Sequence, residues 1–176
     1  MRRIVYPRAG PPEIIRIEEV SDLSPEPNEV VVRVHFAGVN FADLMMRMGL
    51  YDAAPDFPFT PGYEVAGIVE KIGEKVTSLE VGQRVGATTG FGGYAEQVCV
   101  DSKQVFPIPD EIGFDVAAAF QVTYLTAFHM LIQLGNFQPG DTVLIHHAAG
   151  GVGTAAAQLA QAFEAGKLFG VASKSK

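Results

Sequence analysis

An apolar run that meets a glycine turn and then an alanine-rich stretch constrains this chain more than any other feature. Residues 141–147 read DTVLIHH, residues 148–153 read AAGGVG, and residues 154–160 read TAAAQLA. A β-branched run that ends at glycine predicts a buried strand, and the alanines predict a helix. A strand, a tight turn and a helix in this order leave backbone N–H groups free to bind phosphate at the helix N-terminus. The sequence therefore predicts a dinucleotide site, with the pyrophosphate over the start of the helix.

The small residues of this turn have separate expected roles. Ala148, Gly150 and Gly153 fill the three positions of a G-x-G-x-x-G pattern, with alanine in place of the first glycine. We expect Gly150 to let the backbone approach the phosphates and Gly153 to let the helix pack on the strand. Gly151 and Val152 complete the predicted cofactor contacts at the helix start. The alternative is an ordinary strand-to-helix turn that binds no ligand.

The next predicted strand indicates which dinucleotide binds. Residues 167–172 read KLFGVA and predict a second parallel strand that closes a βαβ unit. A site for NAD carries Asp or Glu about 20 residues beyond the glycines, where the carboxylate bonds the ribose 2′-hydroxyl. This chain has Ser173 and Lys174 there, with Lys176 beyond. A hydroxyl and cations suit a 2′-phosphate, so we predict NADPH over NADH. The alternative is that the lysines are surface charges near a chain end.

The charge balance and the single cysteine exclude several classes of protein. The 176 residues include 13 basic and 20 acidic side chains, for a net charge of −7. An acidic chain is a poor partner for nucleic acid or for an anionic membrane surface. The one cysteine excludes an internal disulfide framework and a cysteine-rich zinc site. The start, MRRIVYPR, lacks the apolar run of a signal peptide, and we predict a cytoplasmic protein.

Two long stretches contain no charged residue and raise the question of a membrane span. They are residues 116–138 and residues 142–163. Polar side chains interrupt the first stretch, and glycines and histidines interrupt the second. We therefore predict that neither spans a membrane, and that they form a buried helix and a buried parallel strand.

The first part of the chain has a different pattern from the part that contains the glycine turn. Short β-branched segments, the strongest at residues 29–37, alternate with glycine and proline turns. Many short strands of this kind predict a small β-barrel. The composition becomes helical near residues 110–122, and we predict two domains, 1–114 and 115–176.

Five motifs in a fixed order together resemble a known family. They are residues 38–43 (GVNFAD), 61–69 (PGYEVAGIV), 92–96 (GGYAE), 123–127 (TYLTA) and 148–153 (AAGGVG). In this order the chain resembles the medium-chain dehydrogenase/reductase superfamily, and within it the zinc-free quinone oxidoreductases of the vesicle-amine-transport-protein type. The resemblance implies a GroES-like, partly open β-barrel followed by an incomplete Rossmann domain, which is a doubly wound parallel sheet.

The branch assignment predicts that no metal binds. Zinc-dependent relatives carry an early cysteine and a Gly-His-Glu sequence, and a catalytic zinc needs three protein ligands. This chain has Asn40 in the region of the cysteine and Tyr63 in place of the histidine. Glu64 alone holds no zinc, and the simplest expectation is that it bonds to local backbone. His146 and His147 are adjacent in a predicted strand, so they are expected to point to opposite faces and not to chelate.

The resemblance also implies the reaction and its residues. Without zinc, reduction depends on placing the nicotinamide near an electron-poor carbon, which suits a quinone or an α,β-unsaturated carbonyl. Asn40, Tyr51 and Thr126 are the implied catalytic residues. Asn40 and Thr126 would hold the carboxamide or the substrate oxygen, and Tyr51 would donate a hydrogen bond or a proton. The alternative for Tyr51 is an aromatic side chain that covers the core. Met45 replaces a second tyrosine that relatives often carry.

The length of the chain leaves a second function open. A doubly wound cofactor domain has about six strands, and the sequence predicts only two here. We therefore expect a fragment or truncated product of a reductase, with a homodimer possible for a full chain. The alternative function is a truncated, non-catalytic fragment that acts as a cofactor-binding or partner-binding module.

Overall fold

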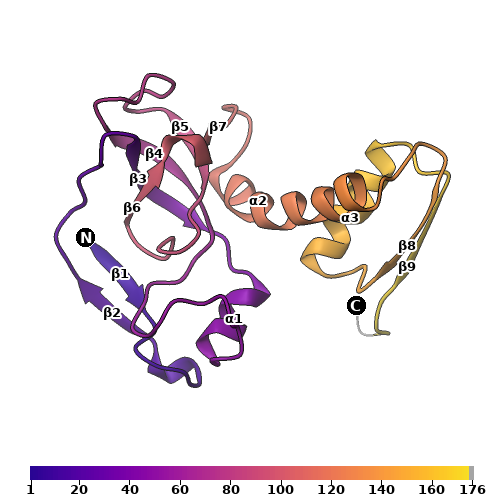
Figure 1. The fold of residues 1–176 in the computed structure, drawn as a ribbon, viewed down its shortest axis with the longest axis horizontal. Helices are drawn as coiled ribbons and strands as arrows, with labels where there is room; N and C mark the ends of the chain where they lie inside the picture. Colours follow the sequence, from indigo (N-terminus) through magenta and orange to yellow (C-terminus); the bar gives the residue numbers. More distant parts are fainter. Residues whose placement is uncertain (175–176) are drawn as a thin grey trace. The chain divides into compact units, whose positions relative to one another are not determined.

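A computed structural model describes residues 1–174 of the chain. The chain forms two compact units, Met1–Gln121 and a second unit that begins at Val122. The division falls inside helix α2 (Phe114–Phe128), within the region where the composition changes. Figure 1 shows the β-strands β1 to β7 in the first unit, and the strands β8 and β9 with helix α3 in the second.

The first unit is built on an antiparallel sheet of five strands. Its strand order is β6-β3-β4-β5-β7, and β1 pairs with β2 in a separate antiparallel sheet. The bounds are β1 (Arg2–Val5), β2 (Arg16–Glu19), β3 (Glu29–Ala37), β4 (Glu64–Ile72), β5 (Arg84–Thr88), β6 (Gln97–Asp101) and β7 (Val105–Pro107). Two short 3₁₀ turns, Pro12–Ile14 and Ser102–Gln104, precede β2 and β7.

Valine fills the core of the five-stranded sheet. Val30 and Val32 of β3 lie in one cluster with Val65 and Val69 of β4 and Val85 of β5, and all five are fully buried. β-branched side chains pack well on a pleated surface, which explains why these segments form strands. The strand predicted over residues 29–37 coincides with β3.

Helix α1 (Phe41–Arg47) is short, and its N-terminus is capped by its own residues. The Asn40 backbone N–H donates to Asp43 Oδ2 at 2.8 Å, as in a capping box. The inward face of the helix buries Met46 beside Tyr6 and Phe59. This packing fixes the position of Asn40 at the start of α1.

The first half of helix α2 docks on strand β4. Gln121 is fully buried, and its Nε2 donates to Val65 O at 2.9 Å and to Ala117 O at 3.1 Å. Ala117 and Ala118 pack against Ala66. The helix continues as a π-helical stretch, His129–Leu134.

The second unit contains the predicted βαβ element. Strands β8 (Thr142–His146) and β9 (Lys167–Val171) are parallel neighbours, and α3 (Gly151–Ala162) connects them. Ala155 and Ala156 of α3 pack on Ile145 of β8. The predicted fold class, a β unit followed by an incomplete parallel α/β sheet, is confirmed.

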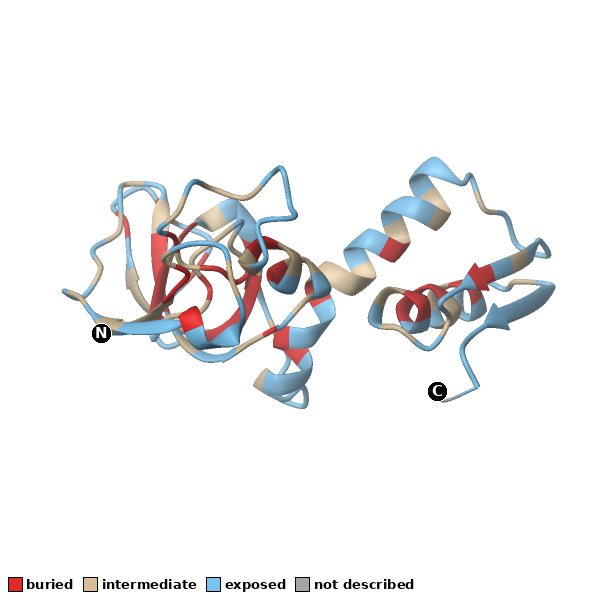
Figure 2. Ribbon diagram, turned by 90° about the horizontal axis from the view of Figure 1, so that it is seen from below, coloured by how far each residue is buried: buried red, intermediate tan, exposed pale blue. Residues whose placement is uncertain are grey.

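The prediction that the uncharged stretches are buried is wrong. Only 22% of the most apolar window of the helix is buried, and Ile145 is the buried residue of β8. The neighbouring strand β9 is exposed at every residue, as Figure 2 shows in pale blue. The reason is that, within the described residues, β8 and β9 hydrogen-bond only to each other. Apolar side chains that a larger parallel sheet would cover therefore remain accessible, such as Leu144 at 59% and Phe169 at 54%.

The helical segment Phe114–Leu134 has the length and composition of a membrane span. It contains 21 residues, its most apolar 18-residue window has a mean hydropathy of 1.2, and 22% of that window is buried. Length and composition of this kind also occur in helices of water-soluble proteins. The absence of a membrane span stays a prediction.

Candidate functional site

The glycine turn of the second unit borders a cavity of about 420 Å³. Its lining comes from the end of β8, the following turn and the end of β9: His146, His147, Ala149, Gly150, Val171, Ala172 and Ser173. The cavity thus lies at the carboxyl ends of two parallel strands, where open α/β sheets bind their ligands. A cavity of this volume is typical of small-molecule and cofactor sites.

The turn brings α3 very close to strand β8. A Cβ added at Gly153 would lie 2.3 Å from the carbonyl oxygen of His147 and 2.8 Å from Ala148 Cα. Only glycine fits at this position without moving the backbone. The Gly150 N–H donates to His147 O at 2.8 Å, which closes the turn just before the helix.

Helix α3 begins directly after this turn, at Gly151. The Thr154 N–H bonds to Gly150 O at 2.8 Å and begins the helical pattern. The N–H groups of Gly151, Val152 and Gly153 precede it, and the first N–H groups of a helix have no intrahelical acceptor. They form the type of site that binds a phosphate group.

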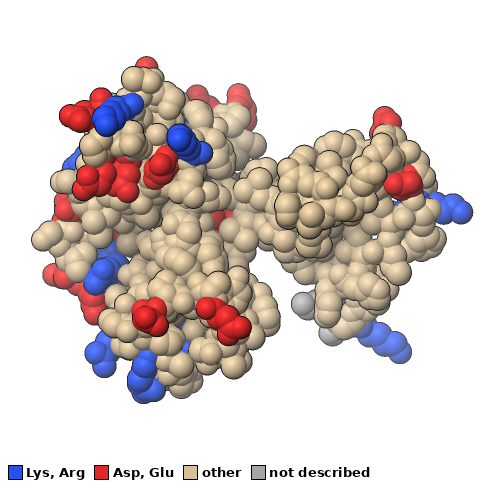
Figure 3. All heavy atoms as spheres, in the orientation of Figure 1, with Lys and Arg blue, Asp and Glu red and all other residues tan. Residues whose placement is uncertain are grey.

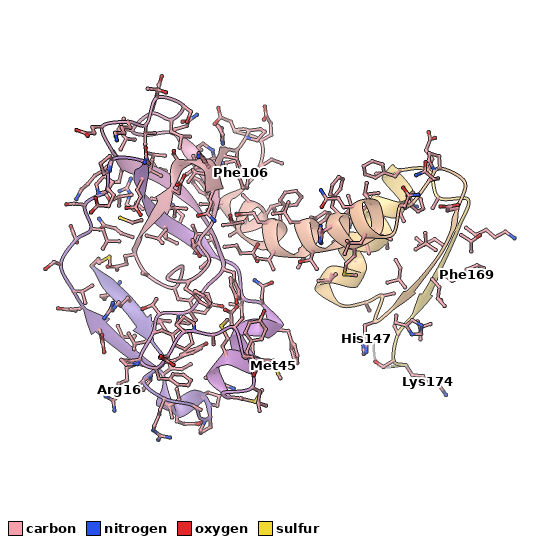
Figure 4. The ribbon with its side chains drawn as sticks, viewed as in Figure 1. Arg16, Met45, Phe106, His147, Phe169 and Lys174 are labelled. Atoms are coloured by element: carbon pink, nitrogen blue, oxygen red, sulfur yellow. The ribbon has the colours of Figure 1, made fainter. Side chains whose placement is uncertain are left out.

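The residues predicted to choose the cofactor lie just beyond β9. Ser173 lines the cavity, whereas Lys174 is exposed and is not among the lining residues. Figure 4 shows Lys174 and His147 at the same end of the two-stranded sheet. Lys176 lies outside the described residues. The lining contains no carboxylate, and on the face drawn in Figure 3 the second unit shows few charged side chains.

Both histidines at the end of β8 line this cavity, but only His146 belongs to the strand, so the prediction that both lie in it is wrong. β8 ends at His146, and His147 adopts a left-handed backbone conformation with φ of 54°. Side chains alternate between faces only along an extended strand, and His147 lies beyond it. No group of three potential metal ligands occurs among residues 1–174. Whether the chain binds a metal stays a prediction.

In the first unit, two buried carboxylates hold Asn40. The Asn40 side-chain Nδ2 donates to Glu64 Oε1 at 2.8 Å, and the Asn40 N–H donates to Asp43 Oδ2. Glu64 and Asp43 are each 1% exposed. Glu64 therefore fixes a predicted catalytic side chain, a role that bonding to local backbone alone did not predict.

Asp43 also accepts a hydrogen bond from a distant tyrosine. The Tyr94 hydroxyl donates to Asp43 Oδ2 at 2.9 Å, whereas the buried Asp43 Oδ1 has no partner. Burial, the charge of Asp43 and this hydrogen bond raise the pKa of Tyr94 well above its usual range. The tyrosine therefore remains a neutral donor to the carboxylate.

Tyr51 lies beside Tyr63, the residue that replaces the histidine of zinc-dependent relatives. Burial, followed by a side-chain hydrogen bond with Tyr51, raises the pKa of Tyr63 to about 12. The Tyr63 hydroxyl also lies 3.9 Å from Met46 Sδ. Tyr51 is 37% exposed, so its hydroxyl is accessible while it remains paired.

The pair of Tyr51 and Tyr63 predicts that the free energy of unfolding depends on pH. Because folding raises the pKa of Tyr63 from 10.0 to about 12, the folded chain holds this proton more tightly than the unfolded chain. The stabilisation of the folded chain by this proton is complete below about pH 10 and is lost as the pH rises toward 12. We expect Tyr63→Phe to flatten the fall in stability over this window. Urea unfolding at several alkaline pH values measures it, and an unchanged slope would contradict the assignment.

Thr126 and Met45 complete the predicted positions. Thr126 is an exposed residue of α2 within the second unit, so the implied catalytic residues are divided between the two units. Met45 lies on α1, where Figure 4 labels it, and is partly buried.

The sequence contains a signal for only some of the residues that hold Asn40. The spacing of Asn40 and Asp43 is that of a capping box and could have indicated their bond. Tyr94 reaches Asp43 across 51 positions of sequence, and no local pattern indicates that bond.

The chain is similar to known proteins over most of its length. Residues 26–110 match the alcohol dehydrogenase GroES-like domain, which confirms the predicted GroES-like fold. The human synaptic vesicle membrane protein VAT-1 homolog is 48% identical over 153 residues, which are 87% of this chain and 39% of that protein.

Solved structures support the same relationship. The human VAT-1 homolog-like protein has a TM-score of 0.96 and 40% identity, covering 100% of this chain and 57% of that one. Escherichia coli quinone oxidoreductase complexed with NADPH has a TM-score of 0.91 and 34% identity, covering 99% and 54%. The chain thus spans roughly half the length of these relatives or less. By its GroES-like domain and these relatives, the chain belongs to the medium-chain dehydrogenase/reductase superfamily, in the group of quinone oxidoreductases and VAT-1 homologs.

Proposed function

We propose that the chain supplies the substrate domain and the adenosine half of the cofactor site of an NADPH-dependent, zinc-independent oxidoreductase. The substrate would be a quinone or an α,β-unsaturated carbonyl. The observation that carries the proposal is the cavity at the ends of β8 and β9. Gly150 and Ser173 both line it, and none of the described lining residues is Asp or Glu. A quinone oxidoreductase that resembles this chain has been crystallised with NADPH.

The residues of the turn fit a dinucleotide. Gly153 permits a close approach that any Cβ would block, and the first N–H groups of α3 have no intrahelical acceptor. We assign the pyrophosphate to Ala148, Gly150, Gly151, Val152 and Gly153, and the 2′-phosphate side to Ser173 and Lys174. Bound NADPH would supply a hydride equivalent to the electron-poor carbon of the substrate.

The side chains of the first unit would act on the substrate oxygen. Tyr51 would donate a proton or a hydrogen bond to the oxygen that gains charge, and its bond with Tyr63 would hold the hydroxyl in place. Asn40 would hold the carboxamide or the substrate oxygen, since Glu64 and Asp43 fix its orientation. Thr126 would share that role from α2. The proposal excludes zinc because Asn40 lies in the region of the cysteine, and Tyr63 in place of the histidine, of zinc-dependent relatives.

An NADPH fluorescence titration combined with a quinone-reduction assay tests the proposal. Saturable NADPH binding with turnover of a quinone supports it. Saturable binding without turnover supports the alternative, a cofactor-binding or partner-binding module, which the exposed apolar residues of α2 and β9 favour. If NADPH did not bind, the glycine turn could be the cofactor site neither of an oxidoreductase nor of a cofactor-binding module.

Lys174 provides a test of cofactor choice. We expect Lys174→Ala to raise the Kd for NADPH about threefold and to leave the Kd for NADH nearly unchanged, because an exposed lysine contributes about 0.5–1 kcal/mol to a phosphate contact. Titrations with both nucleotides measure the ratio. Lys167→Ala is a matched control, since Lys167 is exposed at the opposite end of β9. An equal loss for both nucleotides would remove the preference for NADPH.

A further inference from the structure

His147 occupies an unusual position at the cavity of the second unit. It follows the last residue of β8, is exposed, and has a φ of 54° in the left-handed region. A side chain in this region costs free energy that glycine avoids, although Asn, Asp and His adopt it more often than other residues. The backbone thus leaves the alternation of the strand at His147, and this residue lines the cavity.

Strand register places His147 beside the end of β9. His146 pairs with Val171, and the Ala148 N–H donates to Val171 O at 3.0 Å. His147 lies between these two anchors, and Ser173 follows Val171 by two positions. His147 and Ser173 line the same cavity, so His147 lies near the end of the second strand, where a site of this kind would hold the adenosine ribose.

The charges around His147 favour an anionic ligand. On β8 its titratable neighbour is His146, and among the described residues beyond β9 the charged group is Lys174. Helix α3 contains no charged residue over Gly151–Ala162, and no Asp or Glu is among the residues that line the cavity. Within the described part of the chain, a protonated imidazole at this place therefore meets cations and dipoles but no carboxylate.

We propose that the protonated imidazole of His147 binds the 2′-phosphate of NADPH and makes the preference for NADPH over NADH depend on pH. This inference rests on the proposed function. An imidazole donates a charge-assisted hydrogen bond to phosphate only while it is protonated. His147 thereby adds to the contacts of Ser173 and Lys174 a contact that weakens as the pH rises.

The experiment compares nucleotide affinities at two pH values. The dissociation constants of NADPH and NADH are measured by fluorescence titration for the wild type, His147→Gly, His147→Asn and the control His129→Asn, at about pH 6 and about pH 8.5; His129 is exposed and does not line the cavity. Glycine and asparagine both accept a positive φ, so the turn is retained, and circular dichroism checks the fold. Comparison of variant with wild type at the same pH cancels the titration of the phosphate itself.

We expect both His147 variants to reduce the preference for NADPH about fivefold near pH 6 and less than twofold near pH 8.5. His129→Asn leaves the preference within twofold of the wild type. An unchanged preference of the His147 variants at both pH values overturns the inference. Equal weakening of NADPH and NADH also overturns it, since that result indicates a pyrophosphate contact. An effect of His129→Asn as large as that of His147→Asn overturns the assignment to His147. A wild type that binds neither nucleotide refutes the proposed function and this inference together.

Discussion

Replacement of Gly153 by alanine is expected to lower the free energy of unfolding of the second unit by about 3 kcal/mol and to abolish NADPH binding. A methyl group there would lie 2.3 Å from His147 O and 2.8 Å from Ala148 Cα. Both atoms belong to the backbone and cannot rotate aside. Relief requires α3 to move away from β8, which separates Ala155 and Ala156 from Ile145.

Gly150→Ala is the matched control for this prediction. A Cβ at Gly150 would lie 3.3 Å from His147 O, and the φ of −87° suits alanine. The fold should therefore survive, while the added methyl group stands where the phosphates approach and raises the Kd for NADPH at least tenfold, or about 1.4 kcal/mol. Thermal unfolding by far-ultraviolet circular dichroism and NADPH titration separate the two effects. If Gly153→Ala melts with the wild type, the close approach of helix and strand is refuted.

The elements that could be predicted from the sequence are those with a local physical signal. The β-branched run of residues 29–37 and the strand, turn and helix around Gly150 contain their own periodicity and turn residues. The glycine at position 153 could be assigned a packing role because the requirement arises within one turn of chain. For the same reason the βαβ unit and its parallel pairing were predictable.

Burial and long-range partners could not be predicted in this way. The strand β8 was expected to be buried, but only its Ile145 is, because burial depends on what covers a strand and not on its composition. The bond of Glu64 to Asn40 joins two segments through the tertiary fold, so strand alternation gave no sign of it. His147 was assigned to a strand face, because one residue of left-handed backbone is not visible in a pattern of histidines.

The second large effect is expected from Tyr94→Phe, which removes one hydroxyl group and leaves the ring. Asp43 is 1% exposed, and its Oδ2 accepts from Tyr94 and from the Asn40 N–H, while its Oδ1 has no partner. A buried carboxylate that loses one of two donors is destabilised by about 2–3 kcal/mol, because hydrogen bonds to charged groups are strong and nothing else in the site replaces the hydroxyl. Urea-induced unfolding measures this loss.

Two further variants separate the hydrogen bond from a general effect of removing a hydroxyl. Tyr124→Phe removes an exposed hydroxyl that bonds to Gln158 and should cost less than about 0.5 kcal/mol. A double-mutant cycle of Tyr94→Phe with Asp43→Asn should give a coupling of about 1 kcal/mol or more. Equal losses for Tyr94→Phe and Tyr124→Phe would contradict the buried network.

The same variant connects the network to the proposed reaction. Tyr94→Phe weakens the support of Asn40 in the first unit, whereas the glycine turn belongs to the second unit. If Asn40 acts on the substrate, quinone turnover at saturating NADPH should therefore fall several-fold while the Kd for NADPH stays within twofold of the wild type. A parallel loss of NADPH affinity and turnover would instead indicate that the variant disturbs the fold of the whole chain, and the role assigned to Asn40 would lose its support.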